Sequence, residues 1–336
     1  DHSHTIYLVL DEGFNISQDV GVPINGIIGY YFFKNHPVEI DYIKKTITIY
    51  ENKSKFPKKT KRFDNFPMSV EINKPYMNAD VEMKHEKQSS KLLLDLGNTD
   101  SVWLFPVMIK DFIYNRPNID DFLGRGFSGD IYGKRSRINS LSIGKFRFRK
   151  PIASMPDEYS IQHLKLVKDR KGSIGSEIVR RFTIIFDYPD GKIYFKSNRF
   201  LNDPFLIDGS GLEIKQDGLL WEKEEVPIKT AKINSPINEV GIADTNPDKF
   251  QYKFTLKPSF IVAGTRKDSP AQKAGILKND KLIKIDSRLA KELNLNKIHQ
   301  ILKTNESQQV KLEIQRNGIP LKFELTLEDP IPYIEE

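Results

Sequence analysis

The segment at residues 91–105 constrains the fold of this chain more than any other. An apolar run at residues 92–94 ends at Asp95 and Gly97, and a second apolar run follows at residues 102–105. Short apolar runs separated by a glycine-containing turn are typical of two strands joined by a tight turn. The pattern therefore predicts that Asp95 lies at the end of a buried strand, with its carboxylate in a cleft.

An internal repeat is the second constraint. The motif Gly-x-Ile-Gly occurs at residues 26–29 and again at 172–175, and in each copy an Asp-Tyr pair begins twelve residues after the second glycine, at Asp41 and Asp187. Matching glycines and spacing predict a duplicated unit of a short strand, a glycine turn, a brief helix and a β-hairpin. We expect the glycines to allow close backbone approach beside Asp95. Asp41 and Asp187 are expected to be turn residues rather than catalytic groups.

The spacing of the second copy predicts where the first copy's own aspartate should be. Asp95 precedes Gly172 by 77 residues, and the same distance counted back from Gly26 falls before residue 1. We therefore expect that aspartate upstream of the sequence. Asp11 also ends an apolar run, but the 15 residues to Gly26 are too few for the intervening strands.

A glycine-rich segment at residues 124–133 follows Asp95. Its centre, Gly126, Phe127, Ser128 and Gly129, is interpreted either as a hairpin flap that closes over a bound peptide or as a loop without a role in function. A phosphate-binding loop is not expected, because the strand-to-helix context is lacking.

The composition changes after Pro204, and residues 204–211 are predicted to be a linker. Ser269, Pro270 and Gly275 then have the spacing of an N-cap, a first helical position and a residue just past the end of a short helix. Alternating strands and a second helix, at about residues 295–303, complete the pattern.

The run Ser-Pro-Ala-x-x-Ala-Gly at residues 269–275 resembles the helix of a PDZ domain. The resemblance implies that a C-terminal or extended peptide adds as a strand beside the second helix. The residues it implies for peptide binding are Phe254, Thr255, Leu256, Ile298, Ile301 and Leu302. Each apolar residue among them is equally consistent with a place in the core.

The Asp95 turn and the glycine repeat resemble the Asp-Thr/Ser-Gly signature and the bracing element of retropepsin-like and pepsin-like aspartic peptidases. Together with the PDZ resemblance, the whole chain is similar to bacterial aspartyl proteases with a C-terminal PDZ domain, many of them exported to the periplasm or cell envelope. The resemblance implies that Asp95 is half of a carboxylate dyad, with Gly97, Asn98 and Thr99 in the active-site turn. Leu96 departs from the family, which has Thr or Ser there as a hydroxyl brace.

The expected fold is mainly β, with duplicated aspartic-protease-like β-barrel lobes, the first of them partial, followed by a PDZ domain with two short helices. The expected boundaries are 1–60 for the partial lobe, 61–203 for the second lobe, 204–211 for the linker and 212–336 for the PDZ domain.

Composition narrows the chemistry. Cysteine is absent, which excludes thiolate catalysis, and the six histidines show no ligand spacing, so neither a metal nor another cofactor is expected. No apolar run reaches the length of a membrane span. The formal net charge of +7 is spread along the chain, and the alternating basic and aromatic residues 145–150 predict a half-buried strand rather than a nucleic-acid site.

Two functions stay open. One is an aspartic-type endopeptidase that cleaves peptide or protein substrates, with its partner carboxylate upstream or supplied by a second chain in a homodimer. The other is a scaffold that binds peptides or proteins without cleaving them, which Leu96 favours.

Overall fold

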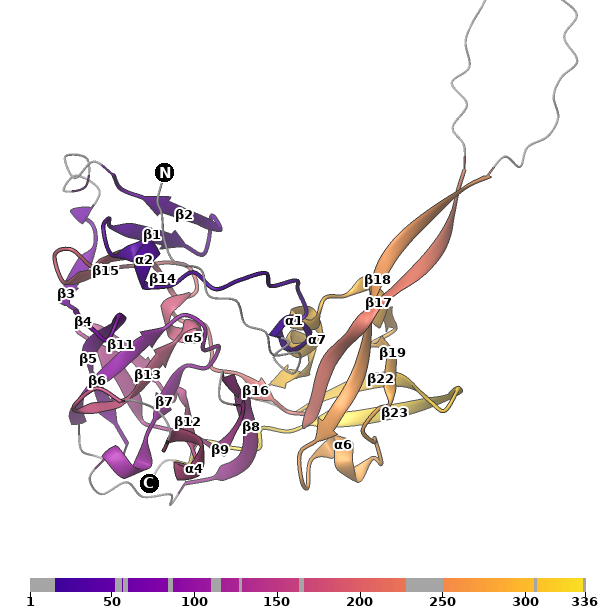
Figure 1. Ribbon diagram of the computed structural model, residues 1–336. Coiled ribbons are helices and arrows are strands. Elements are labelled where there is room, and N and C mark those ends of the chain that lie inside the picture. The colour runs from indigo at the N-terminus through magenta and orange to yellow at the C-terminus, as the bar shows by residue number, and fades with distance from the viewer. Residues whose placement is uncertain are drawn as a thin grey trace, which may run out of the picture.

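The computed structural model describes residues 16–51, 56, 60–83, 87–109, 116–126, 129–162, 166–227, 250–304 and 307–334. Within these ranges no helix is long and apolar enough to cross a membrane. The chain is mainly β. Strands β1 to β15 form a large β body, and strands β17 to β23 form a smaller C-terminal unit (Figure 1).

Helical elements are short throughout the described ranges. They are α1 (Ile16–Val20), α2 (Tyr30–Phe33), η2 (Pro106–Met108), α4 (Glu158–Ile161), α5 (Ser176–Val179), α6 (Pro270–Lys273), η3 (Ala290–Glu292) and α7 (Leu295–Leu302).

The strands of the β body are β1 (Val38–Asp41), β2 (Thr46–Ile49), β3 (Asp64–Pro67), β4 (Ser69–Glu71), β5 (Lys74–Glu82), β6 (Lys87–Asp95), β7 (Val102–Leu104), β8 (Asn118–Gly126), β9 (Gly129–Arg137), β10 (Ser140–Ile143), β11 (Phe146–Arg149), β12 (Ile152–Pro156), β13 (Arg170–Gly175), β14 (Phe182–Asp187) and β15 (Lys192–Ser197). Those that follow are β16 (Ile207–Asp208), β17 (Leu212–Pro227), β18 (Phe250–Thr265), β19 (Lys281–Ile285), β20 (Arg288–Leu289), β21 (Lys303–Thr304), β22 (Gln308–Arg316) and β23 (Ile319–Leu327).

The two copies of the repeat meet in one sheet, of order β2-β1-β14-β15-β3. Each copy forms the predicted hairpin, and β1 pairs antiparallel with β14 so that Val38 lies opposite Phe186. Asp41 is a turn residue as predicted, because its Oδ1 accepts hydrogen bonds from the backbone N–H groups of Ile43 and Lys44. Strands from both sides of the expected domain boundary at residue 60 belong to this one sheet. The boundary itself stays a prediction.

A larger sheet carries the Asp95 segment. Its order is β11-β10-β5-β6-β13-β7-β12-β9-β8, with β4 at the edge of β5. The inner strands β7 and β13 and the apolar end of β6, residues 92–94, are largely buried, as expected for strands covered on both faces. In β11, Phe146 and Phe148 are buried and Arg147 and Arg149 exposed, which confirms the predicted half-buried strand.

The C-terminal unit is a sheet of order β17-β18-β19-β22-β23 with α6 and α7 packed on it. Ser269 caps α6 as predicted by accepting a hydrogen bond from the N–H of Gln272, and Gly275 has a positive φ of 81°. Part of the predicted linker is a strand, because β16 pairs with β21. The backbone polar groups of β16 thereby find hydrogen-bond partners within the C-terminal unit.

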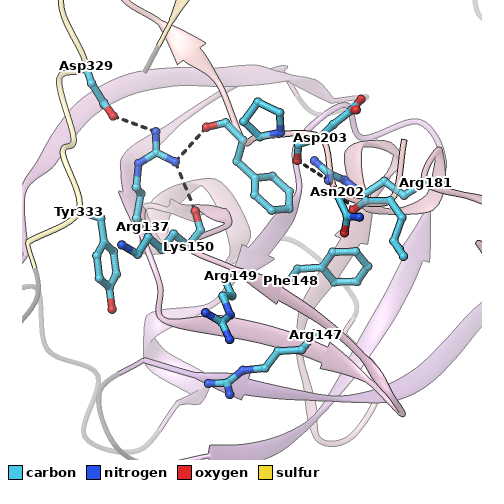
Figure 2. A pocket seen from close by; sticks show the side chains of 13 residues that line it. Arg137, Arg147, Phe148, Arg149, Lys150, Arg181, Asn202, Asp203, Asp329 and Tyr333 are labelled. Carbon is cyan, nitrogen blue, oxygen red and sulfur yellow. Dashed lines mark hydrogen bonds and ion pairs between the residues drawn. The ribbon is translucent and has the colours of Figure 1, made fainter. Parts of the chain in front are cut away.

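The chain returns to the β body after β23. Buried Arg137 donates hydrogen bonds to the carbonyl oxygens of Lys150, Phe205 and Ile331 and to the carboxylate of Asp329, as Figure 2 shows in part. Ile331 is fully buried in the core of the β body. The C-terminal tail therefore ties the two units together.

Candidate functional site

Asp95 lies at the end of β6, on a loop that crosses the end of β13. β13 runs between β6 and β7, parallel to the first and antiparallel to the second. Asp95 lies beside Gly175 in this register. The strand, tight turn and strand predicted for residues 91–105 are thus formed, with the end of another strand enclosed between them.

Hydrogen bonds fix this loop to the second copy of the repeat. The N–H of Gly97 donates to Oδ1 of Asp95 at 3.1 Å, and Oδ1 of Asn98 accepts from the N–H of Asp100 at 2.9 Å. The N–H of Gly175 donates to the carbonyl of Ser101, and that of Ser176, the first residue of α5, donates to the carbonyl of Asn98 at 2.7 Å. Gly97 and Thr99 are exposed. The loop has a defined shape although its tip is open to solvent.

The predicted role of the glycines is confirmed for the second copy. A Cβ on Gly175 would lie 2.1 Å from the carbonyl oxygen of Asp100, and one on Gly172 would lie 1.9 Å from that of Trp103. Real Cβ atoms do not approach this closely, so only glycine fits. In the first copy a Cβ on Gly26 or Gly29 would meet nothing within 4 Å among the described residues.

Asp100 is a further residue of this site, which the sequence analysis did not identify. Its carboxylate accepts hydrogen bonds from Nε1 of Trp103 at 2.6 Å, Oγ of Ser154 at 2.8 Å and Nη1 of Arg135 at 2.7 Å. Burial alone would raise the pKa of Asp100, but the charge of Arg135 and these hydrogen bonds lower it below its ordinary value. Asp100 is therefore an ionised structural group beneath the loop.

Leu96, the residue that departs from the family signature, packs against the core of the β body. Its side chain therefore contributes apolar contact at the position where the family has a hydroxyl.

Arg170 is a cation near enough to Asp95 for the charge of that carboxylate to act on it. Burial lowers the pKa of Arg170, while the charges of Tyr76 and Asp95 act in the opposite direction.

The glycine-rich segment forms the hairpin β8–β9, as the flap interpretation requires. Gly126 lies opposite Gly129, which has a φ of 115°, whereas Phe127 and Ser128 lie outside the described residues. β9 also pairs with β12, and its Arg135 reaches Asp100. The hairpin and the Asp95 loop thus share an ion pair at their bases.

The residues expected for peptide binding lie in different parts of the C-terminal unit. Phe254, Thr255 and Leu256 lie in the outer half of β18, opposite residues 221–223 of β17. Ile298 and Leu302 are fully buried in the core, and Ile301 packs against it. The structure thus gives Ile298 and Leu302 a place in the core and does not place them beside residues 254–256.

A groove lies instead at the start of β17. A cavity of about 790 Å³ is lined by residues 211–215, by His299 of α7, by Gln18 of α1 and by β8 and β9 of the β body. Burial raises the pKa of Asp208 to about 6 at its rim and lowers that of His299 to about 4. In the sequence, this groove is indicated by the turn at residues 208–211. That turn lies within the segment predicted to be a linker.

Helix α1 covers one end of this groove. It packs against β17 and lies beside α7 (Figure 1). A Cβ on Gly21 would lie 2.4 Å from Cβ of Leu295, the first residue of α7. The chain's own N-terminal segment therefore occupies space between the strand and the helix.

A second cavity, of about 490 Å³, lies against the β body near the C-terminal tail (Figure 2). Its two buried cations have partners within the chain. Arg137 binds the tail, and Arg181 donates hydrogen bonds to Glu177 and to the carbonyls of Leu201 and Asp203. These arginines are structural.

Comparison with known families gives one match. A family model described as PDZ domain matches residues 261–316. The C-terminal unit is a PDZ domain. The match covers the second half of β18, α6, β19, α7 and β22, and it makes this unit a peptide-binding module.

A search of solved structures found similarity to a retropepsin-like aspartic protease from Rickettsia conorii. The sequences are 16% identical, the match covers 39% of this chain and 98% of that chain, and the TM-score is 0.26. The comparison with curated proteins gave no match.

Proposed function

We propose that this protein is an aspartic-type endopeptidase in which Asp95 supplies one carboxylate of the catalytic dyad and the PDZ domain binds a peptide or protein. The observation that carries the proposal is the loop of Asp95. It crosses the end of β13 so closely that a Cβ on Gly175 would meet the carbonyl oxygens of Asp100 and Asn98. Such close packing favours a fixed position for Asp95, which a catalytic carboxylate needs because its productive geometry tolerates little displacement.

The chemistry follows from paired carboxylates. When two of them share one proton, the ionised member takes a proton from a water molecule, and the water attacks the carbonyl carbon of the peptide bond. The protonated member donates a hydrogen bond to the carbonyl oxygen. The C–N bond then breaks, the leaving amine takes up the proton drawn from the water, and the dyad is left with one proton as before. In this proposal the partner of Asp95 comes from another segment of the protein or from a second copy.

The hairpin β8–β9 is the proposed flap. Gly126 and Gly129 leave the substrate backbone room to approach, and closure of the hairpin would exclude bulk water from the amide while keeping the one water that attacks it. Arg135 connects the base of the hairpin to Asp100 below the Asp95 loop. Substrate binding under the hairpin would thus change the position of the Asp95 loop through this ion pair.

A peptide-library digestion of the full-length protein at acidic and neutral pH tests the proposal. Cleavage by the wild type, its loss in Asp95→Asn and its retention in Asp217→Asn, a change at an exposed aspartate of β17, would support it. Circular dichroism checks that both variants fold. Cleavage that persists in Asp95→Asn would contradict it.

The second candidate function is a peptide-binding scaffold without catalysis. It is favoured by Leu96, whose side chain is packed in the core and offers no hydroxyl to a partner lobe. Under this alternative the wild type cleaves nothing at either pH, while labelled peptides still bind in fluorescence anisotropy. The two candidate functions therefore predict different results in the digestion and the same result in the peptide-binding experiment.

A further inference from the structure

The hairpin β17–β18 extends beyond the PDZ domain as a two-stranded ribbon (Figure 1). β18 pairs with β19 at Ile261, whereas residues 219–227 pair with residues 250–258 alone among the described residues. An isolated two-stranded ribbon is marginally stable in water unless one of its faces is covered. The outer half of this ribbon therefore needs a partner.

The two faces of the ribbon differ in chemistry. The register places Leu219, Trp221, Tyr252, Phe254 and Leu256 on one face. These side chains are 47 to 70% exposed. The apolar face is thus the open one, which is the reverse of the usual arrangement in a half-buried sheet.

The opposite face is polar and partly covered by the PDZ domain itself. Glu222 forms an ion pair with Lys291, and Lys257 lies 3.1 Å from Glu292 and 3.5 Å from Glu224. Lys291 and Glu292 belong to η3. These contacts fix which face points away from the domain.

We propose that the apolar face of the ribbon is the contact through which two copies of this chain associate. Lys223 and Glu225 lie on this face among the aromatic residues, and both are exposed; Nζ of Lys223 lies 3.4 Å from the centre of the Tyr252 ring, which holds the charge at this face. A two-fold axis between them would set each Lys223 opposite the Glu225 of the other copy. Two-fold contacts are self-complementary in this way.

The exposed area agrees with a weak dimer. The five side chains present on the order of 500 Å² per chain, given their exposed fractions and the size of aromatic side chains. Two facing copies would bury about 1,000 Å², the lower limit for a specific interface. A contact of this size is expected to be weak, and we take a dissociation constant on the order of 10 µM, in the micromolar range, as the value to test. The contact lies on the ribbon and does not depend on peptidase activity.

The charge pattern disfavours a lipid surface as the occupant. Glu225 lies on the same face as Lys223, so an anionic membrane would gain one charge contact and lose another. A second copy satisfies both.

Sedimentation equilibrium of the full chain between about 1 and about 200 µM brackets the expected dissociation constant and tests the proposal. Leu256→Glu, at a side chain that is 47% exposed on the apolar face, should weaken association by about tenfold or more. The matched control is Leu220→Glu, at a side chain that is 49% exposed on the polar face, and it should leave association unchanged. Circular dichroism verifies that both variants fold.

Charge reversal gives a second test. Lys223→Glu should weaken association, and the double variant Lys223→Glu with Glu225→Lys should restore it, because the cross-copy pairs are re-formed with the signs exchanged. A monomeric wild type over the whole range would overturn the proposal, as would equal effects of Leu256→Glu and Leu220→Glu. A monomer that instead co-sediments with phosphatidylserine vesicles would assign the face to a lipid surface.

Discussion

The two copies of the glycine repeat share a sequence pattern but have different surroundings. Ile174 of the second copy is fully buried, whereas Ile27 and Ile28 of the first are 65% and 62% exposed. A Cβ on Gly175 would collide with the backbone of the Asp95 loop, while one on Gly29 would meet nothing within 4 Å. The hairpins that follow are alike, and they pair with one another in a single sheet.

The difference shows which part of the repeat is self-contained. Both hairpins are favoured by their own alternation and turn residues, and they pair with one another through β1 and β14. The glycine segment becomes a strand of a core only where a loop from elsewhere covers it. In the second copy the Asp95 loop does so; over the first copy no described segment takes that place.

The largest effect should appear when the central isoleucine of each copy is shortened. Ile174→Ala should lower the free energy of unfolding by about 2–5 kcal/mol, because it leaves a cavity in the core. Ile28→Ala should change it by less than about 0.5 kcal/mol. Urea denaturation followed by circular dichroism measures both. Equal losses would mean that the first copy is buried in solution.

Local features of the fold could be predicted from the sequence. The strands around Asp95, the hairpins after the glycines and the capped helix at Ser269 each depend on residues within one short segment. Their apolar periodicity, glycines and caps are visible in the sequence.

Contacts between distant segments could not be predicted in this way. Arg135 is 35 residues from Asp100 and Arg137 is 192 residues from Asp329, and no periodicity connects them. The expectation that Phe254, Thr255 and Leu256 bind a peptide together with residues of the second helix rests on a local pattern as well, and it stays a prediction. A strand with alternating apolar residues has the same sequence pattern whether it lies within a domain or in a ribbon that extends from the domain.

The second prediction replaces the second glycine of each copy. Gly175→Ala should cost about 1–3 kcal/mol of stability, because its Cβ would push the backbone of Asp100 away. Gly29→Ala is the matched control, with open space around its Cβ, and should be close to neutral. Thermal denaturation compares them. A cost at Gly29 equal to that at Gly175 would refute the difference between the copies.

The third prediction concerns the half-buried carboxylate of Asp100, beneath the loop of the second copy. The pKa of Asp100 is lowered in the folded state. Its stabilising contribution is therefore present above the unfolded pKa of about 3.9, and it is lost as the pH falls through the lowered folded value. Asp100→Asn should cost about 1–3 kcal/mol at neutral pH, because Arg135 loses its ion pair with Asp100 and keeps only the one with Asp121. The variant should also lose less stability than the wild type between pH 5 and pH 2, values that lie on either side of an aspartate's ordinary pKa. Parallel pH profiles in urea denaturation would contradict this role.

The smallest effect is expected at Leu96, where the covering loop departs from the family signature. Leu96→Thr should lower stability by about 1 kcal/mol, because part of its apolar contact with the core is lost. Thr99→Leu, at an exposed neighbour in the same loop, should stay within about 0.5 kcal/mol of the wild type. If the protein is a peptidase, the threonine hydroxyl introduced by Leu96→Thr should also brace the carboxylate pair and raise the rate of peptide cleavage above that of the wild type. A loss of stability without a gain in the cleavage rate would show that Leu96 contributes to packing alone. The Asp95 loop would then stabilise the second copy of the repeat without a contact to a partner lobe.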